Sequence, residues 1–246
     1  MATHSRIEWT EMTWNPVTGC TKVSQGCKNC YAERMAARLQ AMGSERYRRG
    51  FRVMLHPDLV MLPKKWKRGR TIFVNSMSDL FHEEVPDDFV RAVFGTMCDC
   101  PQHTFQILTK RSDRLRSLAS TLPWSSNIWM GVSVEDARVM HRVNDLRATP
   151  AKVRFLSCEP LIGRLDNLRL HGIHWVIVGG ESGPKARQMN PSWAVSLLRQ
   201  CRAAGVAFFM KQMGGKQDKR GDLRSIPASL RVRQYPELFA MPKLAA

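Results

Sequence analysis

The sequence predicts an α/β protein folded as a partial or complete (βα) barrel. From about residue 70 onward, short apolar runs rich in β-branched and aromatic residues alternate with longer segments whose apolar residues recur at helical spacing. Strands and helices in this rhythm form βαβ units around a parallel sheet. Since roughly six or seven such units follow one another, a barrel is favoured over an open doubly wound sheet.

The expected strands are short and continuously apolar, as strands buried on both faces of a parallel sheet are. They cover residues 71–74, 104–108, 127–132, 153–156, 174–178 and 206–210. Apolar residues at helical spacing predict helices over residues 31–42, 87–98, 111–118, 135–146 and 191–203. Asp87 and Asp88 favour a helix start after Pro86, and Asn190 is a typical N-cap for the last helix.

The length and composition are those of a globular protein, and we expect residues 1–246 to form a single domain, with a cysteine-rich loop at 14–33 and a basic C-terminal extension from about residue 214. No apolar stretch has membrane-spanning length, and the N-terminus lacks the layout of a secretory signal. We therefore expect a cytoplasmic protein with no membrane partner. An odd count of seven cysteines in that reducing compartment argues against disulfides and leaves thiols available as metal ligands.

A strong excess of positive charge indicates a polyanionic partner. Lysine and arginine number 38 against 21 acidic residues, which gives a formal net charge of +17. The basic stretches cover residues 46–52, 64–70 and 216–224. Cations neutralise phosphates, and Tyr47 and Trp66 within the first two stretches are candidates for stacking on bases. Nucleic acid is therefore the expected partner, and the alternative is a basic protein whose charges only solvate it.

Polar side chains follow each of the expected strands. Because the carboxyl ends of the strands meet at one end of a barrel, we expect these side chains to line a common cavity. Carboxylates and lysines there can bind a ligand or transfer protons, but they can equally pair with one another as structural salt bridges. The candidates for catalysis are Asp79, Lys110, Glu135 and Lys211. His82 and Glu159 share this placement, whereas His174 lies inside an apolar pattern and is expected to be a core histidine.

Three cysteines lie in the glycine-punctuated loop near the N-terminus. The two residues between Cys27 and Cys30 suit two thiolates that converge on one metal site, and Cys20 stands earlier in the loop. The helix expected next starts directly after the last cysteine, so its dipole favours the thiolate forms. Three thiols without an adjacent fourth suit a [4Fe–4S] cluster with one iron open for a ligand. The alternative is a closed zinc site that recruits Cys98, Cys100 or a histidine.

The residues Gly179, Gly180, Glu181 and Ser182 follow a hydrophobic strand and have two interpretations. Two glycines permit close approach of the backbone to a ligand, and a glutamate accepts hydrogen bonds from an ammonium group, so the segment is a candidate for cofactor binding. The same pattern is also typical of an ordinary tight turn from strand to loop.

The segment 14–33 resembles the opening signature of a three-cysteine family of poorly characterised proteins found in bacteriophages and bacteria. The sequence there contains WNPVTGC followed by GCKNCYAE. The resemblance continues over most of the chain, through residues 75–82, 108–111, 131–135, 158–161, 178–183 and 209–212.

That family in turn resembles radical S-adenosylmethionine (SAM) enzymes, which have a partial (βα) barrel related to the TIM barrel. The resemblance implies that Cys20, Cys27 and Cys30 hold a [4Fe–4S] cluster and that its open iron chelates the amino and carboxylate groups of SAM. It further implies that reduction releases a 5′-deoxyadenosyl radical and that the Gly-Gly-Glu run helps to seat SAM. The commonest spacing in those enzymes is shorter than the six residues that separate Cys20 from Cys27 here.

Our leading hypothesis is a [4Fe–4S] radical-SAM-like enzyme that modifies or repairs nucleic acid, DNA in preference, with an electron-donor protein as a partner. A barrel mouth rimmed with positive charge suits a base extruded from a duplex. Two alternatives stay open: a non-enzymatic iron–sulfur protein that binds nucleic acid or senses redox state, and a structural zinc protein of a phage or mobile element. SAM binding separates the first hypothesis from the others, and metal identity separates the two alternatives.

Overall fold

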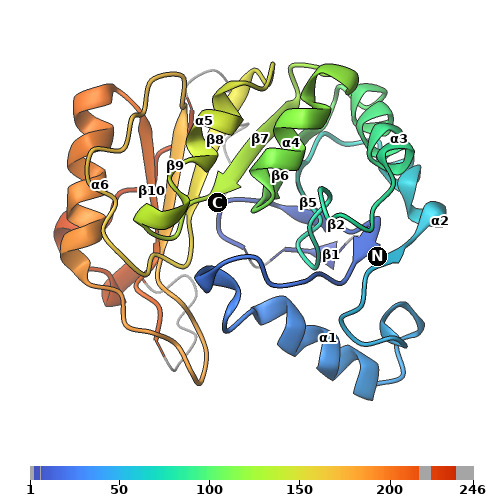
Figure 1. The fold of residues 1–246 in the computed structure, drawn as a ribbon, viewed down its shortest axis with the longest axis horizontal. Helices are drawn as coiled ribbons and strands as arrows, with labels where there is room; N and C mark the ends of the chain where they lie inside the picture. Colours follow the sequence, from blue (N-terminus) through green and yellow to red (C-terminus); the bar gives the residue numbers. More distant parts are fainter. Residues whose placement is uncertain (1–2, 6, 216–222, 237–246) are drawn as a thin grey trace.

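One curved sheet organises the computed structural model, which describes residues 3–5, 7–215 and 223–236 (Figure 1). Its strands are β1 (Thr3–His4), β2 (Met12–Trp14), β5 (Thr71–Val74), β6 (Thr104–Thr109), β7 (Ile128–Ser133), β8 (Val153–Cys158), β9 (Trp175–Gly179) and β10 (Ala207–Gln212). They are hydrogen-bonded in that order, and β1 is antiparallel to β2, while the remaining neighbours pair in parallel to give seven parallel strands. Within the described residues β1 and β10 do not pair with each other, so the predicted barrel is confirmed in its partial form.

The helices cover the outside of this half-barrel. They are α1 (Tyr31–Ala41), α2 (Pro57–Val60), α3 (Asp87–Cys98), α4 (Ser112–Leu118), α5 (Arg142–Arg147) and α6 (Pro191–Ala204). Figure 1 shows α3 and α6 on opposite flanks of the sheet and α1 standing apart below the other elements. The short strands β3 (Val17–Thr18) and β4 (Met54–Leu55) pair separately and flank the polypeptide that carries the cysteines.

The six predicted strands are confirmed to within two residues, and four of the five predicted helices are confirmed with similar accuracy. Asn190 caps α6 as expected, since its side chain accepts the N–H of Ser192 at 2.9 Å. The helix predicted over 135–146 is wrong in its first half. There Asp136 accepts the backbone N–H of Arg138 at 3.0 Å and starts a short 3-10 turn, so α5 begins only at Arg142.

Two features interrupt the predicted alternation of strands and helices. β2 was not expected, because three residues are too short to display a periodic pattern. The connection from β8 to β9, residues 159–174, contains no helix. The half-barrel therefore has one more parallel strand than the sequence indicates, and the connection without a helix is one over which the sequence predicts none.

The two faces of the sheet bury different side chains. Alternate residues of each strand pack with the helices into the main core. The opposite, inner face holds an aromatic cluster made of Trp9, Phe73, Trp129, Phe155, Trp175 and Phe209. Trp9 lies with its ring 4.8 Å from that of Phe73, and Trp129 and Trp175 are 6.1 Å apart in an edge-to-face arrangement. The inner face is thus filled by rings toward the amino ends of the strands.

Further along the same face the side chains become small and polar. Because side chains alternate along a strand, Ser133 lies on the same side as Trp129, and Glu159 and Lys211 continue the rows of Phe155 and Phe209. The aromatic cluster therefore forms the floor of a polar region that opens at the carboxyl ends of the strands.

The prediction of a single domain over residues 1–246 stays a prediction, and residues 216–222 and 237–246 of the basic C-terminal extension lie outside the described residues. Among the residues that the structure describes, no helix combines the length and apolar character needed to cross a bilayer.

The buried histidines predict a loss of stability in mild acid. Burial lowers the pKa of His103 below its ordinary value of 6.5, and its Nε2 lies 3.2 Å from the Pro63 carbonyl oxygen. As the pH falls, the unfolded chain binds a proton first, so this stability is present above about pH 6.5 and lost below it. We expect the melting temperature to fall from about pH 7.5 to about pH 5.5, and to fall less in His103→Gln.

His141→Gln is the matched control, because His141 is exposed. It should keep the wild-type pH dependence in the same thermal scans. An equal slope in the His103→Gln and wild-type proteins would show that the buried ring does not contribute to acid sensitivity.

Candidate functional site

The cysteine loop lies across the carboxyl ends of the strands and is held there by buried acidic side chains. Ser24 donates a hydrogen bond of 2.8 Å to Glu135, which follows β7. Asn29 donates one of 2.9 Å to Glu181, which follows β9. Residues after β7 and after β9 therefore hold the loop at two points, one at Ser24 and one at Asn29.

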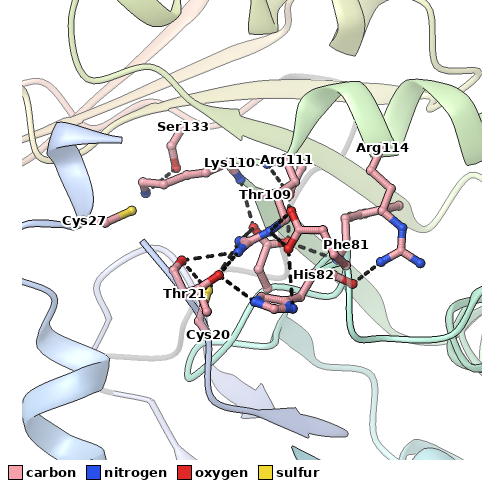
Figure 2. Close-up of polar contacts among 12 residues, drawn as sticks. Cys20, Thr21, Cys27, Phe81, His82, Thr109, Lys110, Arg111, Arg114 and Ser133 are labelled. Atoms are coloured by element: carbon pink, nitrogen blue, oxygen red, sulfur yellow. Dashed lines mark hydrogen bonds and ion pairs between the residues drawn. The ribbon is translucent and has the colours of Figure 1, made fainter. Parts of the chain in front are cut away.

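A third contact comes from Arg111, which follows β6 (Figure 2). Its Nη2 donates to Thr21 Oγ1 at 2.8 Å, and its Nη1 lies 3.4 Å from Cys20 Sγ. His82 Nε2 is also 2.8 Å from Thr21 Oγ1, and its Nδ1 accepts the N–H of Glu84. Burial lowers the pKa of His82, so the ring is neutral and donates through Nε2.

Two glycines allow the loop to approach its supports. Gly19 has a φ of +84°, and a Cβ there would stand 2.1 Å from the carbonyl oxygen of Arg52. Gly26 lies against Glu135, where a Cβ would stand 2.4 Å from Oε1 and 2.5 Å from Cγ. The absence of a side chain at Gly19 and Gly26 thus lets the surrounding protein contact the loop closely.

We expect Gly26→Ala to undock the loop, because the added methyl group overlaps a carboxylate that is buried and held by other partners. The cost should be about 1–3 kcal/mol in urea unfolding, as for other overpacked sites. Trypsin should also cleave faster after Lys22 and Lys28, which lie in the loop. Gly95→Ala in α3 is the control, because a Cβ there meets nothing within 4 Å. Equal trypsin sensitivity of the two variants would contradict the expected role of Gly26.

Asp79, a predicted catalytic residue, is buried and fully hydrogen-bonded. Its Oδ1 accepts from the N–H of Phe81 at 3.0 Å and the hydroxyl of Thr109 at 2.7 Å. Its Oδ2 accepts from the N–H of Lys110 at 3.1 Å and from Arg111 at 3.3 Å. These contacts join the ends of β5 and β6, and they favour a positioning role for Asp79 over proton transfer.

Glu135, a second predicted catalytic residue, is 1% exposed and similarly engaged. Besides Ser24, it accepts from Arg142 at 3.0 Å, and its Oε1 lies 3.6 Å from Lys110 Nζ. Two cations therefore balance one carboxylate beneath the cysteine loop. The contacts favour the structural interpretation that the sequence left open for this residue.

The two predicted catalytic lysines are more accessible than the acids. Lys110 donates to Ser133 at 3.0 Å, and Figure 2 shows its side chain directed toward Ser133 and Cys27. Lys211 pairs with Glu159 at 2.9 Å, with side-chain exposures of 19% and 15%. The structure therefore brings Lys110 and Glu135 together, whereas Lys211 belongs to a separate pair on the inner face.

The backbone of the predicted cofactor segment is engaged by the protein. The carbonyl oxygens of Gly179, Gly180, Glu181 and Ser182 accept, in that order, from Leu161, Gln212, Gly215 and Arg34. These bonds favour the tight-turn interpretation of the segment, and its contact with SAM stays a prediction.

The Glu181 side chain braces the end of the cysteine loop. It is 6% exposed and accepts from Arg187 through both oxygens, at 2.6 Å and 2.9 Å, as well as from Asn29. Burial acts to raise the pKa of Glu181, but the hydrogen bonds from Arg187 and Asn29 outweigh it and leave the pKa below its ordinary value. Glu181 is thus an ionised anchor.

The donor set of the loop fits an iron–sulfur cluster in its chemistry. Cys20, Cys27 and Cys30 are free thiols, and soft thiolates are the ligands of such clusters. Cys30 directly precedes α1, where the helix dipole favours a thiolate. Burial and the nearby Asp79 carboxylate raise the pKa of Cys20 to about 11, while Arg111 acts in the opposite direction.

Within the ranges that the structure describes, no three histidine, cysteine or acidic side chains are already arranged around one ion position. The cluster assignment therefore stays a prediction. The zinc alternative required a fourth ligand, for which Cys98, Cys100 and a histidine were the candidates, and the two cysteines lie at or just after the end of α3, before the amino end of β6. Since the loop lies at the carboxyl ends, the structure does not bring either cysteine to it.

Tyr47 is buried, so the expectation that it stacks on bases is wrong, whereas Trp66 is half-buried and its stacking stays a prediction. Tyr47 is buried against Ala36 beside α1. Trp66 packs on His103 with ring centroids 5.9 Å apart, at the amino ends of β5 and β6. Most of the third basic stretch, residues 216–222, lies outside the described residues. His174 is half-buried and accepts the N–H of Arg154, which agrees with its predicted structural role.

A family model described as DUF5131, a protein of unknown function, matches residues 4–237 of the chain. The chain belongs to this family. A search of curated proteins finds no match for this DUF5131 chain.

Solved structures of spore photoproduct lyase share the fold of the DUF5131 chain. One mutant lyase aligns with a TM-score of 0.50 and 10% identity over 87% of this chain and 59% of the lyase. A second mutant aligns with a TM-score of 0.48 and 12% identity over 73% of this chain and 58% of the lyase. The chain thus spans less than two thirds of the lyase, and the likeness concerns the fold. The predicted partial (βα) barrel is therefore confirmed as a fold that this chain shares with the lyase.

Several residues that hold the loop carry no signal of this role in the sequence. They are Thr21, Ser24, Asn29 and Arg111. Arg111 lies in the polar run after β6, but nothing in its neighbourhood indicates that it reaches a segment 90 residues earlier. The pairing of loop hydroxyls and amides with strand-end charges appears only once the half-barrel is assembled.

Proposed function

We propose that this DUF5131 chain is a [4Fe–4S] radical-SAM-like enzyme that acts on nucleic acid, with DNA preferred. The observation that carries the proposal is the docking of a three-thiol loop over the carboxyl ends of a radical-SAM-type half-barrel. Cys20, Cys27 and Cys30 would hold the cluster, which would supply one electron for the reductive cleavage of SAM.

The roles that we assign to the surrounding residues follow from how exposed their side chains are. Asp79 and Glu135 hold the strand ends and the loop in place, as their closed sets of hydrogen bonds indicate. Lys110 and Lys211 reach the polar region above the aromatic floor and would contact SAM or the substrate. The Gly179–Ser182 segment would form one wall of this region, with Glu181 fixing the loop beside it.

Metal analysis and spectroscopy test the cluster and its open iron. The protein would be purified anaerobically and assayed for iron, sulfide and zinc, and its EPR spectrum recorded after reduction with and without SAM. We expect about four irons per chain and a signal that SAM perturbs. Zinc without iron would overturn the proposal, and a cluster whose signal ignores SAM would leave a cluster protein without the enzyme activity proposed here.

The nucleic-acid partner is supported by the net charge of +17 and by exposed cations near the docked loop. Lys28 and Lys185 are both exposed, and the Asn29 side chain donates to the Lys185 carbonyl oxygen at 2.8 Å. A polyanion held here would lie at the mouth of the half-barrel, whereas the 64–70 stretch lies toward the amino ends of the strands. An electron-donor protein would be the second partner.

Binding of labelled DNA and RNA oligonucleotides at several salt concentrations tests this placement. The double variant Lys28→Ala and Lys185→Ala should weaken DNA binding and reduce the salt slope by about two. The control, Lys65→Ala with Lys67→Ala, removes the same charge near the amino ends of the strands and should have a smaller effect. Equal losses in the two variants would place the contact elsewhere, and preference for RNA would overturn the DNA assignment.

A further inference from the structure

Arg111 is the charged side chain that reaches a cysteine sulfur of the loop. Its guanidinium is buried, with 3% of the side chain exposed, and Nη1 lies 3.4 Å from Cys20 Sγ. The same nitrogen is 3.3 Å from Asp79 Oδ2. The guanidinium fork matches carboxylate and phosphate oxygens, and here one of its N–H groups is directed at a sulfur as well.

The remaining donors of Arg111 leave the guanidinium little freedom. Nε donates to the Glu83 carboxylate at 2.9 Å and 3.0 Å, and Nη2 donates to the hydroxyl and the carbonyl oxygen of Thr21 at 2.8 Å and 3.3 Å. The guanidinium group is thus held by the carboxylates of Asp79 and Glu83, which follow β5, and it also contacts residues 20–21 of the loop. Burial alone would lower the pKa of Arg111, but Asp79, Cys20 and Glu83 raise it, so the group is always a cation.

Ser24 lies close to Cys27 but does not donate to its sulfur as Arg111 does to that of Cys20. Ser24 Oγ is 3.8 Å from Cys27 Sγ, but its single proton is directed to Glu135 at 2.8 Å. Lys110 is directed toward Cys27 but donates to Ser133 (Figure 2), so the hydrogen bond from Arg111 distinguishes Cys20 from Cys27.

We propose that Arg111 is a positioning residue that sets the reduction potential of the cluster through its hydrogen bond to Cys20. This inference rests on the proposed function, because it requires a cluster on the cysteine triad. Reduction adds one electron, supplied by the electron-donor protein or a chemical reductant, and breaks no bond. A fixed N–H donor and a positive charge at the sulfur stabilise the more negative, reduced state, and hydrogen bonds to sulfur are established determinants of such potentials.

Burial strengthens this effect, since charge interactions are less screened away from water. Asp79 offsets part of the guanidinium charge, yet it does not replace the donor that faces the sulfur. Arg111 is therefore expected to raise the potential above that of a cluster with a neutral side chain at this position.

An EPR-monitored redox titration of the reconstituted protein tests the inference. In Arg111→Gln, the ratio of oxidised to reduced cluster at a fixed potential should rise roughly tenfold, which corresponds to a fall of 59 mV in midpoint for a one-electron couple. The control is Arg114→Gln in α4, the helix that Arg111 directly precedes, because Arg114 binds the Asp87 carboxylate and the carbonyl oxygens of His82 and Val85 but no sulfur. Its midpoint should equal that of the wild type.

A second measurement uses the wild-type protein and does not depend on a variant that folds. With arginine labelled with 15N in the guanidinium group, ENDOR of the reduced cluster should resolve a 15N coupling that Arg114→Gln retains. A wild-type cluster without such a coupling, or an Arg111→Gln midpoint equal to that of the wild type at equal iron content, would overturn the inference. Failure of the wild type to hold iron would instead overturn the proposed function, so the two failures are distinguishable.

Discussion

Single substitution of Cys20, Cys27 or Cys30 by serine is expected to abolish the iron–sulfur centre. A hydroxyl is a poor ligand for iron compared with a thiolate, and two thiols cannot hold a cluster that needs three from the protein. Changes to residues that only support the ligands lower metal affinity roughly 10- to 100-fold. Loss of a ligand should lower the affinity by more than this, so that little iron stays bound. Iron and sulfide per chain, measured after anaerobic reconstitution, check this result.

Cys98→Ser is the matched control for this series. Cys98 is half-buried at the end of α3, and its sulfur lies 3.5 Å from the Pro123 carbonyl oxygen, away from the loop. The variant should keep the full iron content. If the loop variants retained iron and Cys98→Ser lost it, the ligands would have to be sought among the other cysteines.

Asp79→Ala is expected to destabilise the protein by about 3–5 kcal/mol, because it leaves the buried Arg111 without its carboxylate partner. Asp79 is 6% exposed and also holds the backbone N–H groups of Phe81 and Lys110. The remaining partner of Arg111, Glu83, is largely exposed and screened by water. Urea unfolding of the metal-free protein measures the loss.

Asp88→Ala provides the comparison for Asp79→Ala. Asp88 pairs with Arg91 one turn later in α3, and its side chain is 93% exposed. Removing this surface pair should cost less than about 1 kcal/mol. If Asp79→Ala lost as little unfolding free energy as Asp88→Ala, the charge of Arg111 would be balanced by other groups. Asp79 would then not hold the loop by way of Arg111.

Much of the fold could be predicted from local pattern. Six parallel strands and four helices follow from continuous apolar runs and helical spacing, which report the burial of each element without regard to its neighbours. β2 could not be found in this way, because its three residues acquire strand geometry only by pairing with β5. The helix predicted from residue 135 begins late because Asp136 accepts the backbone N–H of Arg138 and starts a short 3-10 turn instead.

The types of functional group at the site could be predicted from the sequence, but the role of each residue could not. The thiols and the strand-end charges are visible in the sequence, and the parallel topology requires the strand ends to meet. Whether Asp79, Glu135 and Glu181 face a ligand or hold the loop depends on which donors come within hydrogen-bonding distance. The donors that decide this, such as Arg142 and Arg187, belong to segments that pack against them only in the folded chain.

The sequence by itself determined a (βα) barrel that is partial or complete, the loop with its three cysteines and the excess of positive charge, since each depends on residue type and local spacing. Only the tertiary structure decided that buried acids anchor the loop, that Tyr47 is buried beside α1 and that Arg111 reaches Cys20. Arg111 and Cys20 are 91 positions apart in the chain, and no local pattern encodes a contact at that separation. It arises because parallel strands bring their carboxyl ends to one side, where charges must find partners once water is excluded.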